Sequence, residues 1–227
     1  MRSWLIVGLI FINLSISFGQ EIENEELYNH YKTVFSRATK YNDAAVARDA
    51  VINMMVLNPT SFGLADTLAS LYFDAQQYPS TILVSNDILA SNPGYAPILE
   101  LRALSYEQLG LKARALPDYE SLYLKNNNVY TLYKISTIQG DLGRNNEALT
   151  NLDIIIANEK SMEEKLVFGT SDKKQQEIPI KAAAYNIKGL IYQALDNMEE
   201  AKNSYNKALE VSPEFELVKN NLAELEK

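Results

Sequence analysis

The sequence predicts an all-α protein made of five successive helical hairpins. After residue 25, apolar residues recur at helical spacing, and turns interrupt this periodicity at regular intervals. Pro59 and Pro93 lie 34 residues apart, and each ends an apolar segment because proline lacks the amide hydrogen that a continuing helix needs. No segment shows the alternating apolar and polar residues, bounded by hairpin turns, that are typical of strands.

Composition narrows the classes of function. The chain has 227 residues, of which 47% are hydrophobic, so it can bury a large core. Its formal net charge of -8 argues against nucleic acid, which is bound by basic residues, and against an anionic membrane surface. The chain has no cysteine, so it cannot form a thiolate metal site. It has one histidine, His30, and a histidine metal site would need several. We therefore expect no cofactor, no metal and no nucleic-acid partner.

The first nineteen residues have the order of a secretory signal peptide. Arg2 supplies a positive charge, Trp4 to Leu14 is almost entirely apolar, and small residues follow at Ser17 and Gly19. An uncleaved anchor is the alternative, but this apolar run is too short to span ~30 Å of hydrocarbon as a helix. The pattern predicts a signal peptide at 1–19, cleavage before Gln20, and export, most simply to a periplasm. We expect no membrane span in the remaining chain, in which 20–27 is a lead-in.

The clearest hairpin lies at residues 182–215. Seven residues stand at positions 4, 8, 11, 20, 24, 27 and 32 of this 34-residue unit: Tyr185, Gly189, Tyr192, Ala201, Tyr205, Ala208 and Pro213. This spacing resembles the signature of the tetratricopeptide repeat family. Small residues at positions 8 and 20 let two antiparallel helices approach, and larger ones at 4, 11 and 24 fill the space beside that contact. Lys188 departs from the family pattern, and Ile187 can take over its packing.

Four weaker units are in phase with this one, at about 28–61, 62–95, 96–128 and 129–162. The segment 163–181 is an insertion, and 216–227 is a capping helix whose apolar residues recur at helical spacing. The resemblance therefore covers residues 28–227 and implies a right-handed superhelix of antiparallel helix hairpins, whose concave face is lined mainly by the first helix of each pair.

The resemblance also implies candidate partner-binding positions in the concave groove. Carried over, these are Lys32, Asp66, Phe73, Glu100, Glu107, Tyr130, Tyr133, Thr137, Asn186 and Gln193. A carboxylate clamp of the kind known in this family is not expected, because Ser36 stands where the clamp needs asparagine. Among these residues, Tyr130 and Tyr133 are the preferred surface candidates, since tyrosine suits protein interfaces.

The insertion offers a second candidate surface through Leu166, Phe168 and Ile178. Insertions in repeat arrays often carry binding residues. The alternative is that the preceding helix lengthens and the loop packs back through Phe168 and Ile178.

No nucleophile–base pair or phosphate-binding loop is recognisable, so no catalytic residue is predicted. The expected function is a non-catalytic scaffold or adaptor of the bacterial cell envelope that holds a protein or peptide segment in its groove. The alternative is a structural or regulatory accessory subunit of an envelope complex or exported enzyme that binds through 163–181.

Overall fold

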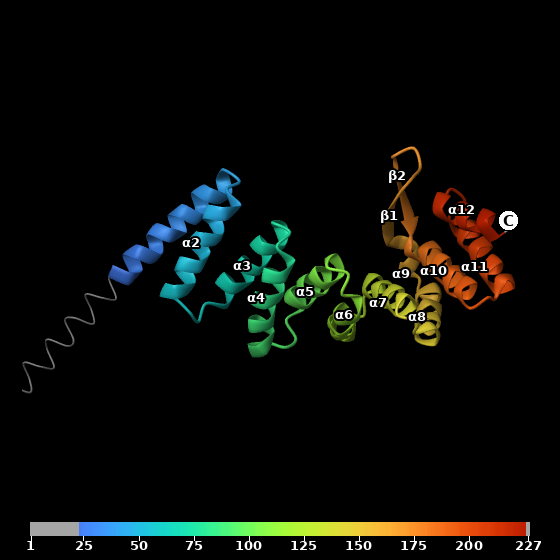
Figure 1. Ribbon diagram of the computed structural model, residues 1–227, viewed down its shortest axis with the longest axis horizontal. Helices are drawn as coiled ribbons and strands as arrows, with labels where there is room; N and C mark the ends of the chain where they lie inside the picture. The colour runs from blue at the N-terminus through green and yellow to red at the C-terminus, as the bar shows by residue number, and fades with distance from the viewer. Residues whose placement is uncertain (1–22, 226–227) are drawn as a thin grey trace, which may run out of the picture. The chain divides into compact units, whose positions relative to one another are not determined.

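The computed structural model describes residues 23–225, so the signal-peptide prediction for 1–19 lies outside the described residues. The chain divides into two compact units, the first ending at Leu101 and the second beginning at Arg102. Each unit is a series of antiparallel helical hairpins (Figure 1). The predicted all-α class of successive hairpins is confirmed, with one local exception in the second unit. No helix in the described part of the chain is long and apolar enough to cross a membrane.

The first unit begins with a helix over residues 23–40. It continues with α2 (Ala44–Leu57), α3 (Phe62–Asp74), α4 (Tyr78–Ser91) and the first part of α5 (Ala96–Gln108). The Asp43 side chain caps α2 by accepting a hydrogen bond from the Val46 amide at 3.1 Å. Among the described residues of this unit, one apolar cluster surrounds Val51, Met54 and Leu68 and another surrounds Ile88 and Ile98.

The second unit holds the remaining elements. They are α6 (Lys112–Asn126), α7 (Val129–Asp141), α8 (Asn145–Ala157), α9 (Lys160–Glu163), β1 (Lys165–Gly169), β2 (Gln175–Pro179), α10 (Ile180–Ala194), α11 (Met198–Val211) and α12 (Glu216–Leu225).

A residue in the left-handed region marks the turn inside each hairpin. These residues are Asn42, Gln76, Gly110, Gly143 and Asp196, with φ between 56° and 73°. Glycine and asparagine adopt this conformation most readily, which explains three of the five identities. The turns recur every 33 or 34 residues until the last interval, which the insertion lengthens.

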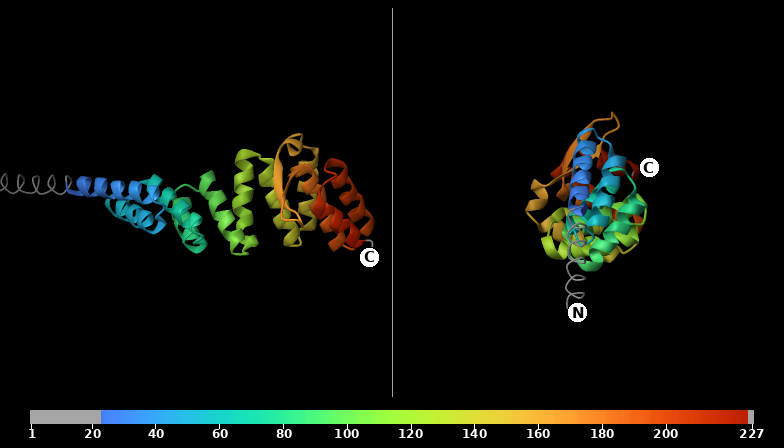
Figure 2. Two further views of the ribbon diagram at one scale, coloured as in Figure 1. Left: turned by 90° about the horizontal axis from the view of Figure 1, so that it is seen from above. Right: turned by 90° about the vertical axis from the view of Figure 1, so that its left-hand side faces the viewer.

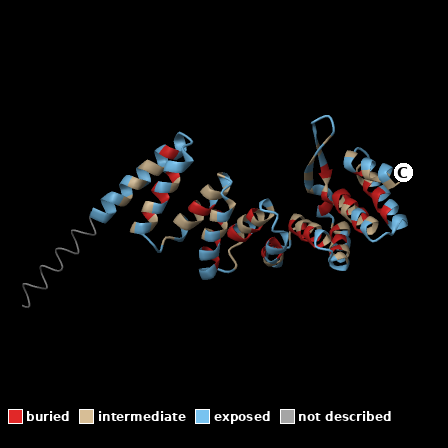
Figure 3. Cartoon of the chain, in the orientation of Figure 1, coloured by how far each residue is buried: buried red, intermediate tan, exposed pale blue. Residues whose placement is uncertain are grey.

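The small residue at position 20 is buried in every hairpin, and buried residues lie where paired helices face each other (Figure 3). Ala115, Ala148 and Ala201 have no exposed surface, and Thr81 takes the same place in the second hairpin. These residues allow the close helix approach that the repeat pattern predicted.

The insertion is where the sequence prediction was wrong. No strand was expected, and one interpretation lengthened the preceding helix, but α8 ends at Ala157 and a two-stranded antiparallel hairpin follows α9. Leu166 pairs with Ile178 and Phe168 with Gln176. Because polar Gln176 lies on the inward face of β2, the apolar alternation of that strand is hidden in the sequence.

The inward face of the β1–β2 hairpin packs beside α12 (Figures 1 and 2). The rings of Phe168 and Phe215 lie 4.8 Å apart, and Ile178 is buried in the same cluster. The Gln176 side chain donates to the Glu214 carbonyl and accepts from the Glu216 amide at 3.1 Å. The hairpin therefore supports the turn that leads into α12.

Candidate functional site

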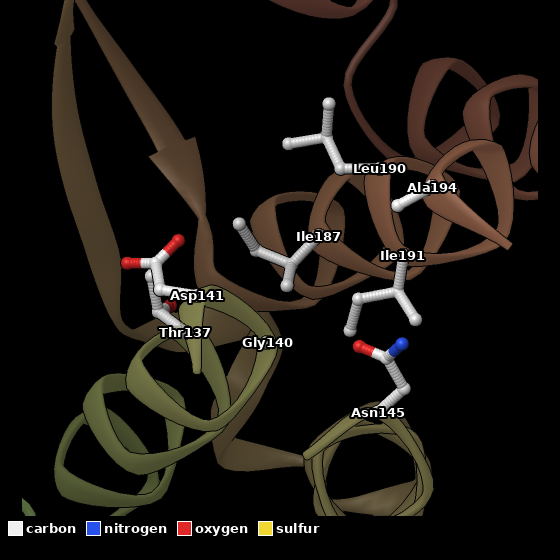
Figure 4. A pocket seen from close by; sticks show the side chains of 8 residues that line it. All are labelled: Thr137, Gly140, Asp141, Asn145, Ile187, Leu190, Ile191 and Ala194. Carbon is white, nitrogen blue, oxygen red and sulfur yellow. The ribbon is translucent and has the colours of Figure 1, made fainter. Parts of the chain in front are cut away.

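An open pocket lies between α7 and α10, the first helices of two successive hairpins in the second unit. Its volume is about 190 Å³. The residues that line this α7–α10 pocket are Thr137, Gly140, Asp141, Asn145, Ile187, Leu190, Ile191 and Ala194 (Figure 4). The two helices approach closely at Gly140, where an added Cβ would lie only 3.3 Å from Cδ1 of Ile191.

The wall that α10 contributes is apolar. Ile187, Leu190 and Ala194 recur at spacings of three and four, which places them on one face of the helix. Leu190 remains 41% exposed although it is a large apolar side chain. Apolar surface is unfavourable in water, so the free energy falls when another apolar group covers it.

The rim of the pocket is acidic. Asp141 lines it and forms an ion pair with Lys112, and both side chains are about half exposed. The Thr137 hydroxyl donates to the Tyr133 carbonyl at 2.9 Å, so its hydrogen is already used within α7. The pocket therefore offers apolar contact, with one carboxylate at its edge to face a polar or basic group.

The predicted residues on α7 follow one face of that helix. Tyr130, Tyr133 and Thr137 stand at spacings of three and four, and Thr137 lines the pocket. Tyr133 is largely withdrawn from water, and this burial raises the pKa of its phenol to about 12. Tyr130 is half-buried.

Of the predicted residues on α10, Asn186 is wrong as a groove residue. It is 2% exposed, and its Oδ1 accepts a hydrogen bond from Nδ2 of Asn221 at 2.9 Å. The reason is that α12 covers this part of α10. Gln193 is half-buried and accepts a hydrogen bond from the Tyr205 hydroxyl at 3.0 Å.

Glu107 is also engaged within the protein. It accepts a hydrogen bond from the Tyr119 hydroxyl and forms an ion pair with Lys134 at 2.8 Å. Its charge is thus balanced without an external partner, which makes it a weaker groove candidate than its repeat position suggests.

Four predicted residues belong to the first unit. Lys32 and Glu100 are exposed, Asp66 accepts a hydrogen bond from the Tyr95 hydroxyl at 3.2 Å, and Phe73 contacts Tyr78 with ring centroids 5.6 Å apart.

The three predicted insertion residues, Leu166, Phe168 and Ile178, point inward and pack rather than face solvent. Only the outer face of the hairpin, which carries Val167, is open.

Sequence reasoning missed several residues of the α7–α10 pocket, namely Gly140, Asp141, Asn145, Ile187, Ile191 and Ala194. The helical spacing of Ile187, Leu190 and Ala194 is the signal that could have found the apolar wall. Ile187 was instead assigned to packing because it adjoins Lys188.

Comparisons with known proteins agree with this architecture. The tetratricopeptide repeat family model matches residues 182–215, the hairpin of α10 and α11. A search of curated protein sequences found no match.

Solved structures share the fold. A tetratricopeptide repeat protein from Parabacteroides merdae has a TM-score of 0.66 and 19% identity, over 88% of this chain and 72% of that one. YrrB, described as a TPR protein with an unusual peptide-binding site, has a TM-score of 0.68 and 15% identity, over 90% and 96%. MamA has a TM-score of 0.64 and 16% identity, over 83% and 93%. The last hairpin therefore matches the tetratricopeptide repeat, and the chain shares the fold of these solved structures.

Proposed function

We propose that the protein is a non-catalytic scaffold that binds a segment of another protein in the α7–α10 pocket. The observation that carries this proposal is the apolar wall of α10, on which Leu190 is 41% exposed beside a pocket of about 190 Å³. Concave apolar sites with a few polar groups at the edge are the usual form of a ligand site.

The lining indicates the chemistry of the bound segment. Ile187, Leu190 and Ala194 would contact a medium-sized apolar side chain. Asp141 at the rim would favour a basic or hydrogen-bonding neighbour in the same segment, in competition with Lys112. The peptide-binding site named for YrrB supports a peptide ligand by analogy of fold.

The alternative is a role as an accessory subunit that binds through the outer face of the β1–β2 hairpin. Val167, 61% exposed, is the apolar residue on that face. Deleting the hairpin would not test this alternative, because Phe168, Gln176 and Ile178 help to hold the start of α12. Single substitutions on the two surfaces separate the candidates instead.

The test is a selection of peptides from a random library on the wild-type protein, followed by affinity measurements on variants. Leu190→Asp places a charge on the apolar wall and is expected to weaken the selected peptides at least about tenfold. Val167→Asp, the matched control on the hairpin, is expected to leave them unchanged. Binding that is lost in Val167→Asp but kept in Leu190→Asp would support the accessory-subunit alternative.

We also propose that the protein works outside the cytoplasm, in a bacterial envelope. The support is the charge, apolar run and small residues of 1–19. Mass spectrometry of the chain recovered from an envelope fraction is expected to find Gln20 as the first residue. A cytoplasmic chain that retains Met1 or Arg2 would contradict export.

A further inference from the structure

A second pocket opens on the opposite face of α7. Its volume is about 230 Å³, and the residues that line it are Glu120, Tyr123, Leu124, Leu132, Ile135, Gln139 and Asn151. Leu132, Ile135 and Gln139 lie roughly half a turn around α7 from Thr137 and Asp141, which belong to the α7–α10 pocket. We call this second site the Gln139 pocket.

Its floor carries an incompletely bonded amide pair. Gln139 is 3% exposed, and its Oε1 accepts a hydrogen bond from Nδ2 of Asn151 at 2.9 Å. Within the described residues, Nε2 of Gln139 and Oδ1 of Asn151 have no hydrogen-bond partner. The Ser85 hydroxyl is the one fully buried side-chain polar atom without a partner in the described residues, so Nε2 of Gln139 and Oδ1 of Asn151 both reach the accessible surface. A free donor beside a free acceptor there offers a place for a ligand group that can do both.

The repeat pattern explains why the pocket exists. Gln139 stands four residues before the turn residue Gly143. At the same distance before their own turn residues, three other hairpins carry a tyrosine: Tyr72, Tyr106 and Tyr192. The fourth hairpin therefore lacks an aromatic ring at this position.

Tyr72 shows what the ring does where it is present. In the first unit it packs against the cluster of Val51 and Met54, and Arg48 of α2 lies 5.8 Å from its ring centroid. It thus contacts the second helix of the preceding hairpin. In the fourth hairpin the corresponding space, between α6 and α7, is the Gln139 pocket.

We propose that the Gln139 pocket binds the side chain of a tyrosine that a partner protein presents. The ring would contact Leu124, Leu132 and Ile135, while the hydroxyl accepts from Nε2 of Gln139 and donates to Oδ1 of Asn151. Size permits this, because a cavity of ~150 Å³ lined by apolar side chains is enough to bind benzene. The chain already contains a phenol that donates to a side-chain amide oxygen, from the Tyr205 hydroxyl to Oε1 of Gln193 at 3.0 Å.

The apolar side chains and the rim charge further define the ligand. Leu124 is 86% exposed, so an incoming ring would cover apolar surface that is now in water. Glu120 at the rim forms an ion pair with Arg144 at 4.0 Å, so the rim has no net positive charge that would favour a phosphorylated ring over the neutral phenol.

The experiment titrates the full chain with N-acetyl-tyrosinamide and follows the side-chain amide signals of Gln139 and Asn151 by NMR. N-acetyl-phenylalaninamide, which lacks only the hydroxyl, is the comparison. A saturable shift with the tyrosine derivative, and an affinity about tenfold or more above that of the phenylalanine derivative, is expected. Equal binding of the two, or no saturable shift, would overturn the proposal and leave solvent as the partner of the amide pair.

Two variants of Gln139 and one control variant sharpen this test. Gln139→Tyr restores the missing ring within the chain and is expected to abolish the response to N-acetyl-tyrosinamide. Gln139→Leu keeps the apolar pocket but removes the amide, so the two derivatives are expected to bind equally. As a control outside both pockets, Gly63→Ala is expected to change neither affinity, because nothing lies within 4 Å of a Cβ there. Wild-type discrimination that survives in a folded Gln139→Leu variant would also overturn the proposal.

Discussion

Gly189 on α10 lies directly against the ring of Tyr205 on α11. A Cβ at Gly189 would lie 2.6 Å from Cδ1 and 2.9 Å from Cζ of that ring, closer than carbon atoms pack. Tyr205 itself has no exposed surface, and its hydroxyl donates to Gln193. The absence of a side chain at one position thus makes room for the largest buried side chain of the hairpin.

Replacing Gly189 with alanine is therefore expected to destabilise the second unit. Forcing the ring aside costs about 1–3 kcal/mol, which outweighs the gain of at most ~1 kcal/mol in helix propensity. Urea unfolding followed by circular dichroism measures the change. Gly63→Ala is the matched control, since nothing lies within 4 Å of a Cβ there, and it is expected to be neutral or slightly stabilising. A Gly189→Ala variant as stable as wild type would contradict this reading of the contact.

The Arg102–Asp118 pair is expected to matter more than the other ion pairs. Arg102 donates from Nε and Nη2 to the two carboxylate oxygens at 2.8 Å and 2.6 Å, and Asp118 is only 4% exposed. Asp118→Ala leaves the guanidinium without these bonds in a partly buried site, at a cost of about 3 kcal/mol. Glu214→Ala, which removes the exposed pair with Lys219, is expected to cost less than about 1 kcal/mol. Equal losses in the two variants would show that burial of Asp118 does not strengthen its pair.

The inward face of the β1–β2 hairpin is expected to be structural. Phe168→Ala removes the ring that packs on Phe215 and is expected to destabilise the second unit by about 2–4 kcal/mol. Val167→Ala, on the adjacent outward position, is expected to stay within about 0.5 kcal/mol of wild type. Hydrogen exchange of the α12 amides offers a local readout, which is expected to speed up in Phe168→Ala only. Unchanged exchange in α12 would mean that the hairpin does not hold that helix.

Two tyrosines whose pKa values are raised predict a loss of stability at high pH. Burial raises the pKa of Tyr133 and of Tyr205 to about 12 from an ordinary value of 10.0, and Glu224 adds to the shift at Tyr205. Above pH 10 these phenols ionise in the unfolded chain but stay protonated in the folded one, so the free energy of unfolding falls from about pH 10 to about pH 12.

Denaturation curves at pH 9 and pH 11 are expected to differ less in a Tyr133→Phe/Tyr205→Phe variant than in wild type. Lysine deprotonation affects both proteins alike, so the difference between them isolates the phenols. The same pH dependence in both would contradict the assignment.

The repeated helices could be predicted because the residues that pack the two helices of a hairpin together lie close in the sequence. The small residue at position 20, such as Ala115 or Ala201, meets a partner helix only a few residues away along the chain, so its spacing is visible in the sequence. The binding positions were harder to predict. Thr137 does line the α7–α10 pocket, whereas Asn186 is covered by α12 and Glu107 is neutralised by Lys134.

What the sequence by itself determined is the type and period of the hairpins, because these follow from side-chain spacing over a single repeat. The tertiary structure decided which surfaces stay open. Whether Leu190 is exposed, whether Gln176 turns inward on a strand, and whether the missing tyrosine at Gln139 leaves a pocket all depend on neighbouring elements that a single repeat does not contain. Burial is a property of packed neighbours, and position within a repeat specifies it only where those neighbours repeat as well.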